Sequence, residues 1–187
     1  MSRIRTFLSV ELARPVRDKI VDLQEELARA GAEVKWTEPE NLHVTLIFLG
    51  EVPDKEIHAI CKLASETVHG MEPFTMCVES AGCFPNLRRP RILWVGVGAG
   101  AQELVKIHDE LETPLFDLGY RMEERKYTPH ITLGRVKSDR PTDQLTAALQ
   151  QHADWHGGEQ IVSEIHVMGS ELTRDGPRYT VLGRAKL

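Results

Sequence analysis

The stretch HVTL at residues 43–46 recurs as HITL at residues 130–133. Successive side chains of a β-strand point to opposite faces, so the histidine and the threonine of each copy share one face. The residues between them, Val44 and Ile131, are apolar and point to the other face. Each copy therefore predicts a strand that buries one face and presents an imidazole beside a hydroxyl on the other.

The segments around the two copies follow a similar order of strand, helix, motif strand, helix and strand pair. The expected strands are 4–12, 42–50, 73–84, 91–98, 130–136, 160–172 and 178–187, and the expected helices are 15–31, 54–68, 104–118 and 144–151. This alternation is typical of a mixed α/β or α+β chain and indicates a degenerate internal duplication. Because no long linker separates the halves, we expect residues 1–187 to form a single catalytic domain with two lobes, each supplying one His-x-Thr motif.

The composition is that of a folded globular protein, with 187 residues, 41% hydrophobic and 27% charged. A net charge of -5 argues against a protein that coats nucleic acid by bulk electrostatics, although a local basic groove remains compatible with it. No apolar run approaches the length of a membrane span, and no export signal is visible. Cys61, Cys77 and Cys83 lack CxxC spacing, which favours buried free thiols in a reducing cytoplasm over a disulfide framework or a zinc site.

The two motifs become chemically informative if the halves pack about an approximate two-fold axis. One groove would then hold two histidines and two threonine hydroxyls, a set that suits phosphoester hydrolysis without a metal. In-line displacement at phosphorus requires a base and an acid on opposite sides, and imidazole, with a reference pKa of about 6.5, can serve as either. The hydroxyls can donate to the non-bridging oxygens. A single His-x-Thr pair, in contrast, is usually a structural feature of a strand.

Three blocks of the sequence also resemble a known family. WTEPENLHVTLIFLGEV at residues 36–52, GCFPNLRRPRILWVGV at residues 82–97 and KYTPHITLGRV at residues 126–136 are similar to the signature blocks of the 2H phosphoesterases, in particular the RNA 2',3'-cyclic phosphodiesterases, also called 2'-5' RNA ligases. The resemblance covers essentially the whole chain. It implies an α+β, bilobal fold, in which two pseudo-symmetric lobes with antiparallel sheets line a central cleft and the helices lie outside.

The resemblance also implies an activity and roles for residues. The activity is hydrolysis of a terminal 2',3'-cyclic phosphate on RNA or a nucleotide to a 2'-phosphate, without metal or cofactor, with reversible 2'-5' RNA ligation as a possible further activity. His43 is implied as the proton donor to the leaving 3'-oxygen, His130 as the proton acceptor that activates water, and Thr45 and Thr132 as phosphate ligands. The residues themselves leave the acid and the base unassigned, because the two motifs are nearly symmetric. We expect a monomer.

Two alternatives are kept open. The cleft could bind RNA without catalysis, although binding alone does not require two titratable groups. A different 2H reaction, on 2'-5' oligonucleotides or on ADP-ribose cyclic phosphate, would use the same two motifs.

The cationic residues near the motifs are further candidates. Strand alternation places Arg135 on the face opposite His130, but Gly134 could mark a bulge that redirects it, and the resemblance favours contact with substrate. Arg88, Arg89 and Arg91 could follow an RNA backbone or form a solvated loop. Phe48, in contrast, shares its expected face with the apolar residues of its strand and is expected in the core.

Two other patterns are interpreted structurally. GVGAGA at residues 96–101 matches a dinucleotide-binding fingerprint but lacks a run of parallel βαβ units, which favours a tight turn between a strand and a helix. His152 and His156 have the spacing of a helical metal site, but Gly157 and Gly158 end the helix and no third ligand is evident, which favours surface histidines.

Overall fold

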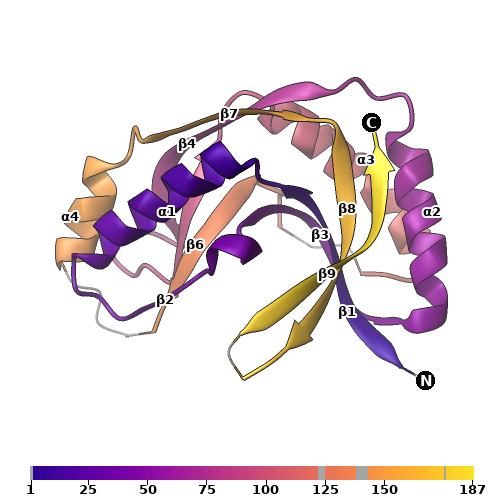
Figure 1. Ribbon diagram of the computed structural model, residues 1–187, viewed down its shortest axis with the longest axis horizontal. Helices are drawn as coiled ribbons and strands as arrows, with labels where there is room; N and C mark the ends of the chain where they lie inside the picture. Colours follow the sequence, from indigo (N-terminus) through magenta and orange to yellow (C-terminus); the bar gives the residue numbers. More distant parts are fainter. Residues whose placement is uncertain (1, 122–124, 138–142, 175) are drawn as a thin grey trace.

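A curled antiparallel sheet organises the computed structural model, which describes residues 2–121, 125–137, 143–174 and 176–187 (Figure 1). Within those residues nine strands pair in the order β7-β4-β5-β6-β3-β1-β8-β9, with β2 paired to β6. The strands are β1 (Arg3–Glu11), β2 (Val34–Trp36), β3 (His43–Pro53), β4 (Phe74–Phe84), β5 (Ile92–Val97), β6 (His130–Val136), β7 (His156–Val162), β8 (Glu164–Leu172) and β9 (Pro177–Lys186). The helices are α1 (Arg14–Ala28), α2 (Ile57–Val68), α3 (Ala101–Asp117) and α4 (Asp143–Gln151), and short 3₁₀ turns span Pro39–Asn41 and Asp54–Glu56.

The sheet consists of two repeated halves that exchange elements. The motif strands β3 and β6 lie at the centre, and the order outward is β3-β1-β8-β9 in one half and β6-β5-β4-β7 in the other. Thus β4 belongs to the half that holds the second motif, and β8 belongs to the half that holds the first. Two helices exchange likewise, since α1, which precedes the first motif, packs on β7 of the second half, and α3, which precedes the second motif, packs on β3 of the first half. The other two stay with the motif that they follow, α2 on β8 and β9 and α4 on β4.

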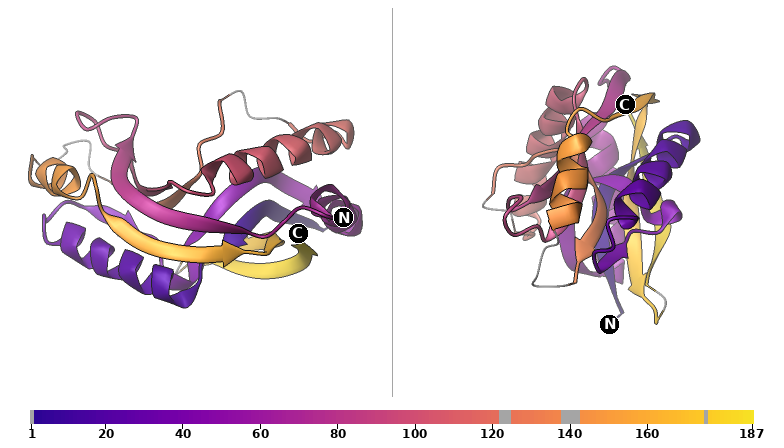
Figure 2. Two further views of the ribbon diagram at one scale, coloured as in Figure 1. Left: turned by 90° about the horizontal axis from the view of Figure 1, so that it is seen from above. Right: turned by 90° about the vertical axis from the view of Figure 1, so that its left-hand side faces the viewer.

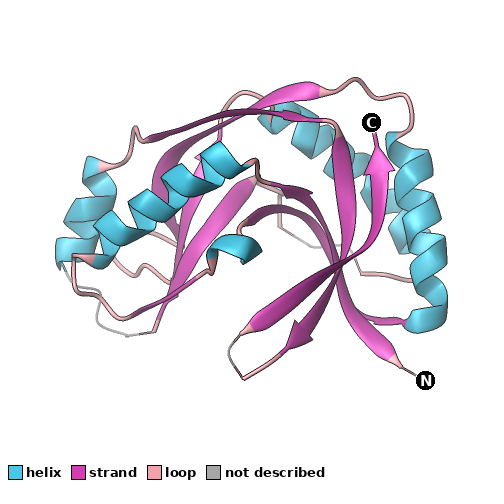
Figure 3. Cartoon of the chain, in the orientation of Figure 1, coloured by secondary structure: helices cyan, strands magenta, loops and turns pink. Residues whose placement is uncertain are grey.

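The helices accordingly lie toward the two ends of the molecule with the strands between them (Figure 3). Two further views show α1 and α3 on opposite sides of the strands (Figure 2). The predicted α+β fold with two repeated halves is therefore confirmed, and the antiparallel sheets of the two halves join into one. The segment 160–172, expected as one strand, is divided at Ser163 between β7 and β8.

The two motifs meet at the seam between the halves. β3 and β6 pair antiparallel through Val44 and Ile131, the middle residue of each motif, and both side chains are fully buried. In an antiparallel pair, the neighbours of a matched pair are matched in reverse order. His43 therefore lies across from Thr132, and Thr45 lies across from His130, on the face opposite the core.

A bulge follows the threonine of each motif. The partner of β1 shifts from Thr45 to Ile47, and the partner of β5 shifts from Thr132 to Gly134, so one extra residue, Leu46 or Leu133, enters each motif strand. An extra residue inverts the face of everything that follows it. The bulge inferred at Gly134 is thus present in β6.

The same bulge in β3 overturns the expectation for Phe48. This side chain is 44% exposed and lines the cleft, whereas strand alternation had placed it in the core. Phe48 and Arg135 occupy equivalent positions, each three residues after the threonine of its motif.

The structure gives the backbone setting of the two patterns that were interpreted structurally. Gly100 adopts a φ of 85° immediately before α3, so residues 98–100 form a tight turn between β5 and a helix, and β5 has antiparallel neighbours on both sides. His152 bonds Glu26 at 2.7 Å beyond the end of α4, while His156 begins β7, so the two histidines do not share a helix. No helix among the described residues has both the length and the apolar character needed to cross a bilayer.

Candidate active site

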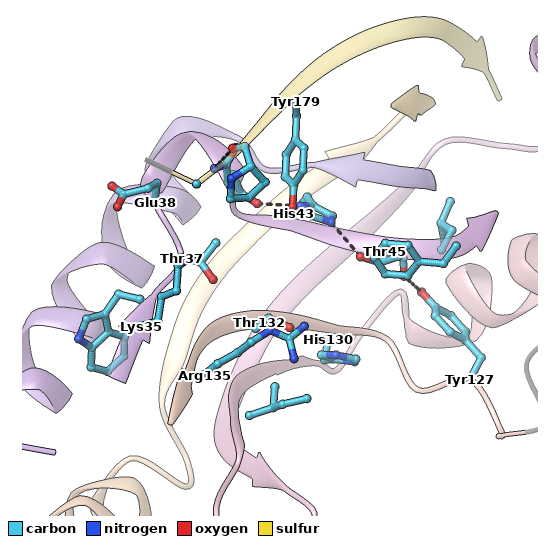
Figure 4. Close-up of a pocket in the computed structure, with 17 residues that line it drawn as sticks. Lys35, Thr37, Glu38, His43, Thr45, Tyr127, His130, Thr132, Arg135 and Tyr179 are labelled. Carbon is cyan, nitrogen blue, oxygen red and sulfur yellow. Dashed lines mark hydrogen bonds between the residues drawn. The ribbon is translucent and has the colours of Figure 1, made fainter. Parts of the chain in front are cut away.

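A cleft of about 370 Å³ lies along the seam between the halves (Figure 4). All five residues predicted for the site, His43, Thr45, His130, Thr132 and Arg135, line this cleft. Further lining residues are Lys35, Trp36, Thr37, Glu38, Asn41, Leu46, Phe48, Ile92, Tyr127, Gly176, Pro177 and Tyr179. The loop arginines Arg88, Arg89 and Arg91 are not among the lining residues, so the structure does not bring them into this site.

A hydrogen bond to the backbone just before β3 holds the His43 ring in one orientation. Nδ1 lies 2.7 Å from the carbonyl oxygen of Asn41, an acceptor, so Nδ1 must carry a proton and donate. Nε2 is left for the cleft, where it lies 2.8 Å from the hydroxyl oxygen of Thr45. The rings of Phe7 and Tyr179 flank the imidazole, with centroids at 4.9 and 5.5 Å.

Burial lowers the pKa of His43 below the ordinary value of 6.5. The bond to the Asn41 carbonyl opposes this shift, and the nearby charge of His130 adds to it. The free protein therefore favours the neutral imidazole, which has Nδ1 protonated and Nε2 available as an acceptor.

His130 repeats the arrangement in the second half. Its Nδ1 lies 2.8 Å from the carbonyl oxygen of Thr128, two residues earlier, just as the Nδ1 of His43 bonds the carbonyl two residues earlier. The edge of Phe84 packs against its ring, with centroids 5.2 Å apart. The local chain geometry thus fixes the same tautomer at both histidines and leaves each Nε2 for chemistry.

The spacing across the seam suits a phosphoryl group. His43 and His130 are diagonal neighbours on the antiparallel pair. Diagonal neighbours in such a pair lie roughly 7 to 8 Å apart. The two threonines occupy the other diagonal. A tetrahedral phosphorus between them would have an imidazole on either side and a hydroxyl near each non-bridging oxygen.

The two ends of the cleft differ in chemistry. At one end Arg135 pairs in register with Lys35 of β2, which places two cations beside Thr132. Gly134 permits this close pairing, because a β-carbon there would lie 2.7 Å from Cγ1 of Val34 and 3.0 Å from the Lys35 carbonyl oxygen. At the other end Phe48 offers an aromatic ring where the second half has Arg135.

Tyr127 and Tyr179 complete the walls, and sequence reasoning missed Tyr179 and the contact that Tyr127 makes with the first motif. The hydroxyl of Tyr127 donates to the backbone carbonyl of Thr45 at 2.8 Å, and its ring stacks parallel on His108 with centroids 4.3 Å apart. Tyr127 therefore ties the second half to the first motif. Its position three residues before His130 was the available signal, whereas Tyr179 is distant from both motifs in sequence and gave none.

The hairpin between β8 and β9 covers one side of the cleft. The side-chain amide of Asn41 donates to the carbonyl of Pro177 at 2.9 Å and holds the start of β9 against the entry to β3. The loop that orients His43 through its carbonyl thus also anchors this hairpin.

Two facing His-x-Thr motifs on a duplicated α+β sheet define a 2H phosphoesterase. The family model described as LigT like Phosphoesterase matches the chain twice, at residues 10–94 and at residues 95–179. The chain belongs to this LigT-like phosphoesterase family, and the double match corresponds to the two halves of the sequence.

Relatives of similar length are found in both sequence and structure. The RNA 2',3'-cyclic phosphodiesterase of Methanothermobacter thermautotrophicus is 38% identical over 178 residues, which are 95% of this chain and 96% of that protein. The RNA 2',3'-cyclic phosphodiesterase of Aeropyrum pernix is 38% identical over 169 residues, 90% of this chain and 94% of that protein. The crystal structure of E. coli LigT in its apo form has a TM-score of 0.81 at 26% identity and covers 100% of this chain and 99% of that one. E. coli LigT complexed with 3'-AMP gives a TM-score of 0.80 at 25% identity, with the same coverage.

Proposed function

We propose that this protein is an enzyme that hydrolyses terminal 2',3'-cyclic phosphates of RNA or nucleotides to 2'-phosphates. The observation that carries this proposal is the antiparallel pairing of Val44 with Ile131, which sets the two motifs face to face in one cleft. Relatives named RNA 2',3'-cyclic phosphodiesterase, 38% identical over nearly the whole chain, support the same substrate class. The E. coli relative solved with 3'-AMP and with phosphate is consistent with a nucleotide phosphate in this cleft.

In the proposed mechanism His130 accepts a proton from water, and the resulting hydroxide attacks phosphorus. The bond between phosphorus and O3' breaks on the opposite side, and His43, which must be the imidazolium in the substrate complex, gives its Nε2 proton to O3'. The phosphate stays on O2'. His130 then loses its proton and His43 regains one, which restores the starting state.

Thr45, Thr132 and Arg135 are proposed to hold the phosphate. The hydroxyls donate to the non-bridging oxygens, where negative charge gathers, and Arg135 adds a charge-assisted contact from the end that also holds Lys35. Thr45 must exchange its present bond to the Nε2 of His43 for one to the phosphate. Phe48, at the other end, offers a surface on which a base can stack.

The donor set of the cleft supports chemistry without a metal. Among the described residues, the groups of three side chains that could hold an ion are Cys77 with Glu79 and His156, and His108 with Asp109 and Glu112, and none of these lines the cleft. Glu38 is the one carboxylate among the described lining residues. We further propose a single catalytic domain that acts as a monomer, and a cytoplasmic location, which its three free cysteines support.

Incubation with a nucleoside 2',3'-cyclic phosphate tests the activity directly. The expected product is the nucleoside 2'-phosphate, identified by chromatography and phosphorus NMR, with turnover unchanged by EDTA. A 3'-phosphate product would mean that O2' leaves and would contradict the assigned geometry, and absence of product between pH 5 and 8 would favour a binding module. Accumulation of a 2'-5' linked product from cyclic phosphate and 5'-hydroxyl ends would add 2'-5' ligation, in which a 5'-hydroxyl attacks phosphorus in place of water and the same acid and base act.

The pKa of His43 predicts a pH dependence. A group that must be protonated to act loses activity as the pH rises through its pKa, and burial places the pKa of His43 below 6.5 in the free protein. The value of kcat/KM, which reports the free enzyme, should therefore fall on the alkaline side from below pH 6.5. Bound phosphate is an anion beside the ring and favours the imidazolium, so the same fall in kcat should occur at higher pH.

NMR titration of the His43 ring measures this shift without turnover. The free protein should give a pKa below 6.5, saturation with inorganic phosphate should raise it, and His130→Ala should raise it because a like charge is removed. A value above 6.5 in the free protein, unchanged by phosphate, would remove the basis for the predicted pH profile.

A further inference from the structure

A second cluster of chemically active side chains lies at the edge of the sheet, outside the cleft. Cys77 and Glu79 share one face of β4, two residues apart, and β7 places His156 opposite Glu79 and Glu159 opposite Cys77. β4 is two strands away from the motif strand β6, and none of these four residues lines the cleft. The mechanism proposed above uses none of them.

The thiol of Cys77 already contacts both of its neighbours at distances within the range of hydrogen bonds to sulfur. Sγ of Cys77 lies 3.4 Å from Oε2 of Glu79 and 3.7 Å from Nδ1 of His156, and the imidazole nitrogen lies 3.9 Å from the same carboxylate oxygen. A direct N–H···O hydrogen bond would bring the last two atoms to about 2.7 to 3.2 Å. Only the imidazole and the carboxylate are too far apart for a direct hydrogen bond, and the three ligand atoms surround a common point.

The same distances match the ligands of a tetrahedral metal ion. Zinc bonds of about 2.0 to 2.3 Å at tetrahedral angles separate neighbouring ligand atoms by roughly 3.3 to 3.7 Å. Two of the three observed separations, 3.4 and 3.7 Å, fall within this range, and the third, 3.9 Å between the imidazole and the carboxylate, lies just above it, so small side-chain adjustments would suffice. Gly98 helps to fix the carboxylate, because a β-carbon there would overlap with the carboxyl group of Glu79.

We propose that Cys77, Glu79 and His156 form a binding site for a zinc ion. Thiolate, imidazole and carboxylate together are a zinc donor set, and the three atoms belong to neighbouring strands that the sheet already holds in register. A water molecule would supply the fourth ligand. The His156 and Glu79 side chains are 58% and 45% exposed, so an ion can reach the site from solvent.

Binding at this site must release a proton. Burial and the carboxylates of Glu79 and Glu159 raise the pKa of Cys77 to about 11, so the free protein holds a thiol at neutral pH. Formation of the bond between zinc and sulfur replaces the bond between hydrogen and sulfur, and the proton passes to the buffer. Affinity should therefore weaken as the pH falls.

The consequence of such a site would be structural. β7 is the outermost strand of its half and is joined to the sheet through β4 alone along the described path. An ion shared by β4 and β7 would link the edge strand to its neighbour and stabilise the folded state, because the ion binds the folded chain preferentially. This differs from the sequence-based expectation, in which Cys77 was a buried free thiol.

Titration of the full-length, metal-stripped protein with cobalt(II) tests the proposal, because cobalt reports a thiolate ligand by an intense near-ultraviolet charge-transfer band. One equivalent should produce this band together with the visible absorption of tetrahedral cobalt, and zinc should displace it. Calorimetry of zinc binding in two buffers of different ionisation enthalpy should show about one proton released per ion. Zinc should also raise the melting temperature.

Variants separate this site from adventitious binding. Cys77→Ser and His156→Ala should weaken zinc binding by roughly 100-fold or more and abolish the rise in melting temperature, and the exposed His156 makes the second variant safe for folding. Cys61→Ser and His69→Ala, which remove a thiol and an imidazole outside the cluster, should bind zinc as the unaltered protein does. Absence of the thiolate band, or equal zinc affinity in His156→Ala, would overturn the proposal. These tests measure metal binding and thermal stability, so their outcome is independent of whether the protein hydrolyses cyclic phosphates.

Discussion

Alanine at His43 or at His130 is expected to lower kcat/KM for a nucleoside 2',3'-cyclic phosphate by about 10²- to 10⁴-fold each, since each imidazole transfers one proton in the transition state. Without His130 the attacking water keeps its proton, and without His43 the alkoxide at O3' must leave unprotonated. The two steps belong to one displacement at phosphorus. The double variant should consequently be little worse than the more damaged single variant, as is typical of residues that act as a unit.

Steady-state kinetics of the three variants beside His58→Ala measures this effect. His58 lies exposed on α2 and should retain full activity. Unfolding midpoints of all variants show whether any loss arises from the fold, a control needed most for His43, whose ring packs against the buried Phe7. Activity within tenfold of the unaltered protein in either single variant would exclude a two-histidine mechanism. Losses that multiply in the double variant would indicate two independent contributions instead of one concerted displacement.

The prediction from sequence succeeded where it needed only the alternation of side chains along a single strand. Alternation of faces put the His and Thr of each motif on one side and Val44 and Ile131 on the other, and both apolar side chains are buried. Pairing of the two motifs needed only the duplication and an approximate two-fold axis. The antiparallel pair at the seam supplies that axis.

The prediction failed where the strand departs from regular alternation. Regular alternation was applied to Phe48 and a bulge was considered only for Arg135, because Gly134 is a visible signal of irregular backbone and Ile47 is not. Both strands nevertheless bulge after the threonine, since the register with β1 and with β5 shifts at the same place. Because the two halves repeat, a bulge considered in β6 could also have been predicted at the equivalent position of β3.

The exchange of strands between the two halves could not be predicted from local sequence patterns. That β4 joins the second half and β8 the first follows from how the halves pair, and no residue periodicity encodes it. The same exchange brings Tyr179 on β9 to the ring of His43, a contact across more than a hundred residues of sequence. Cleft residues that come from such exchanged strands can be recognised only once the sheet order is known.

Removal of a threonine hydroxyl from either motif is the second large expected effect. A preorganised donor at a developing oxyanion contributes about 10²- to 10³-fold to kcat, so Thr132→Val should lower kcat by that amount while KM changes little. Thr132→Ser, which keeps the hydroxyl, should restore most of the activity. A loss confined to KM would show that the hydroxyl binds the ground state and the transition state equally.

Thr45 should behave differently from Thr132 because its hydroxyl has two successive partners. In the free protein its oxygen lies 2.8 Å from Nε2 of His43, and the neutral imidazole there must accept the hydroxyl proton. Thr45→Val removes a bond to the neutral form of His43 and should raise the pKa of that ring, in addition to lowering kcat as Thr132→Val does. NMR titration of His43 in both variants separates the two effects. An equal His43 pKa in Thr45→Val and in Thr132→Val would mean that the bond between Thr45 and His43 carries no weight in solution, and that the two halves of the site are functionally symmetric.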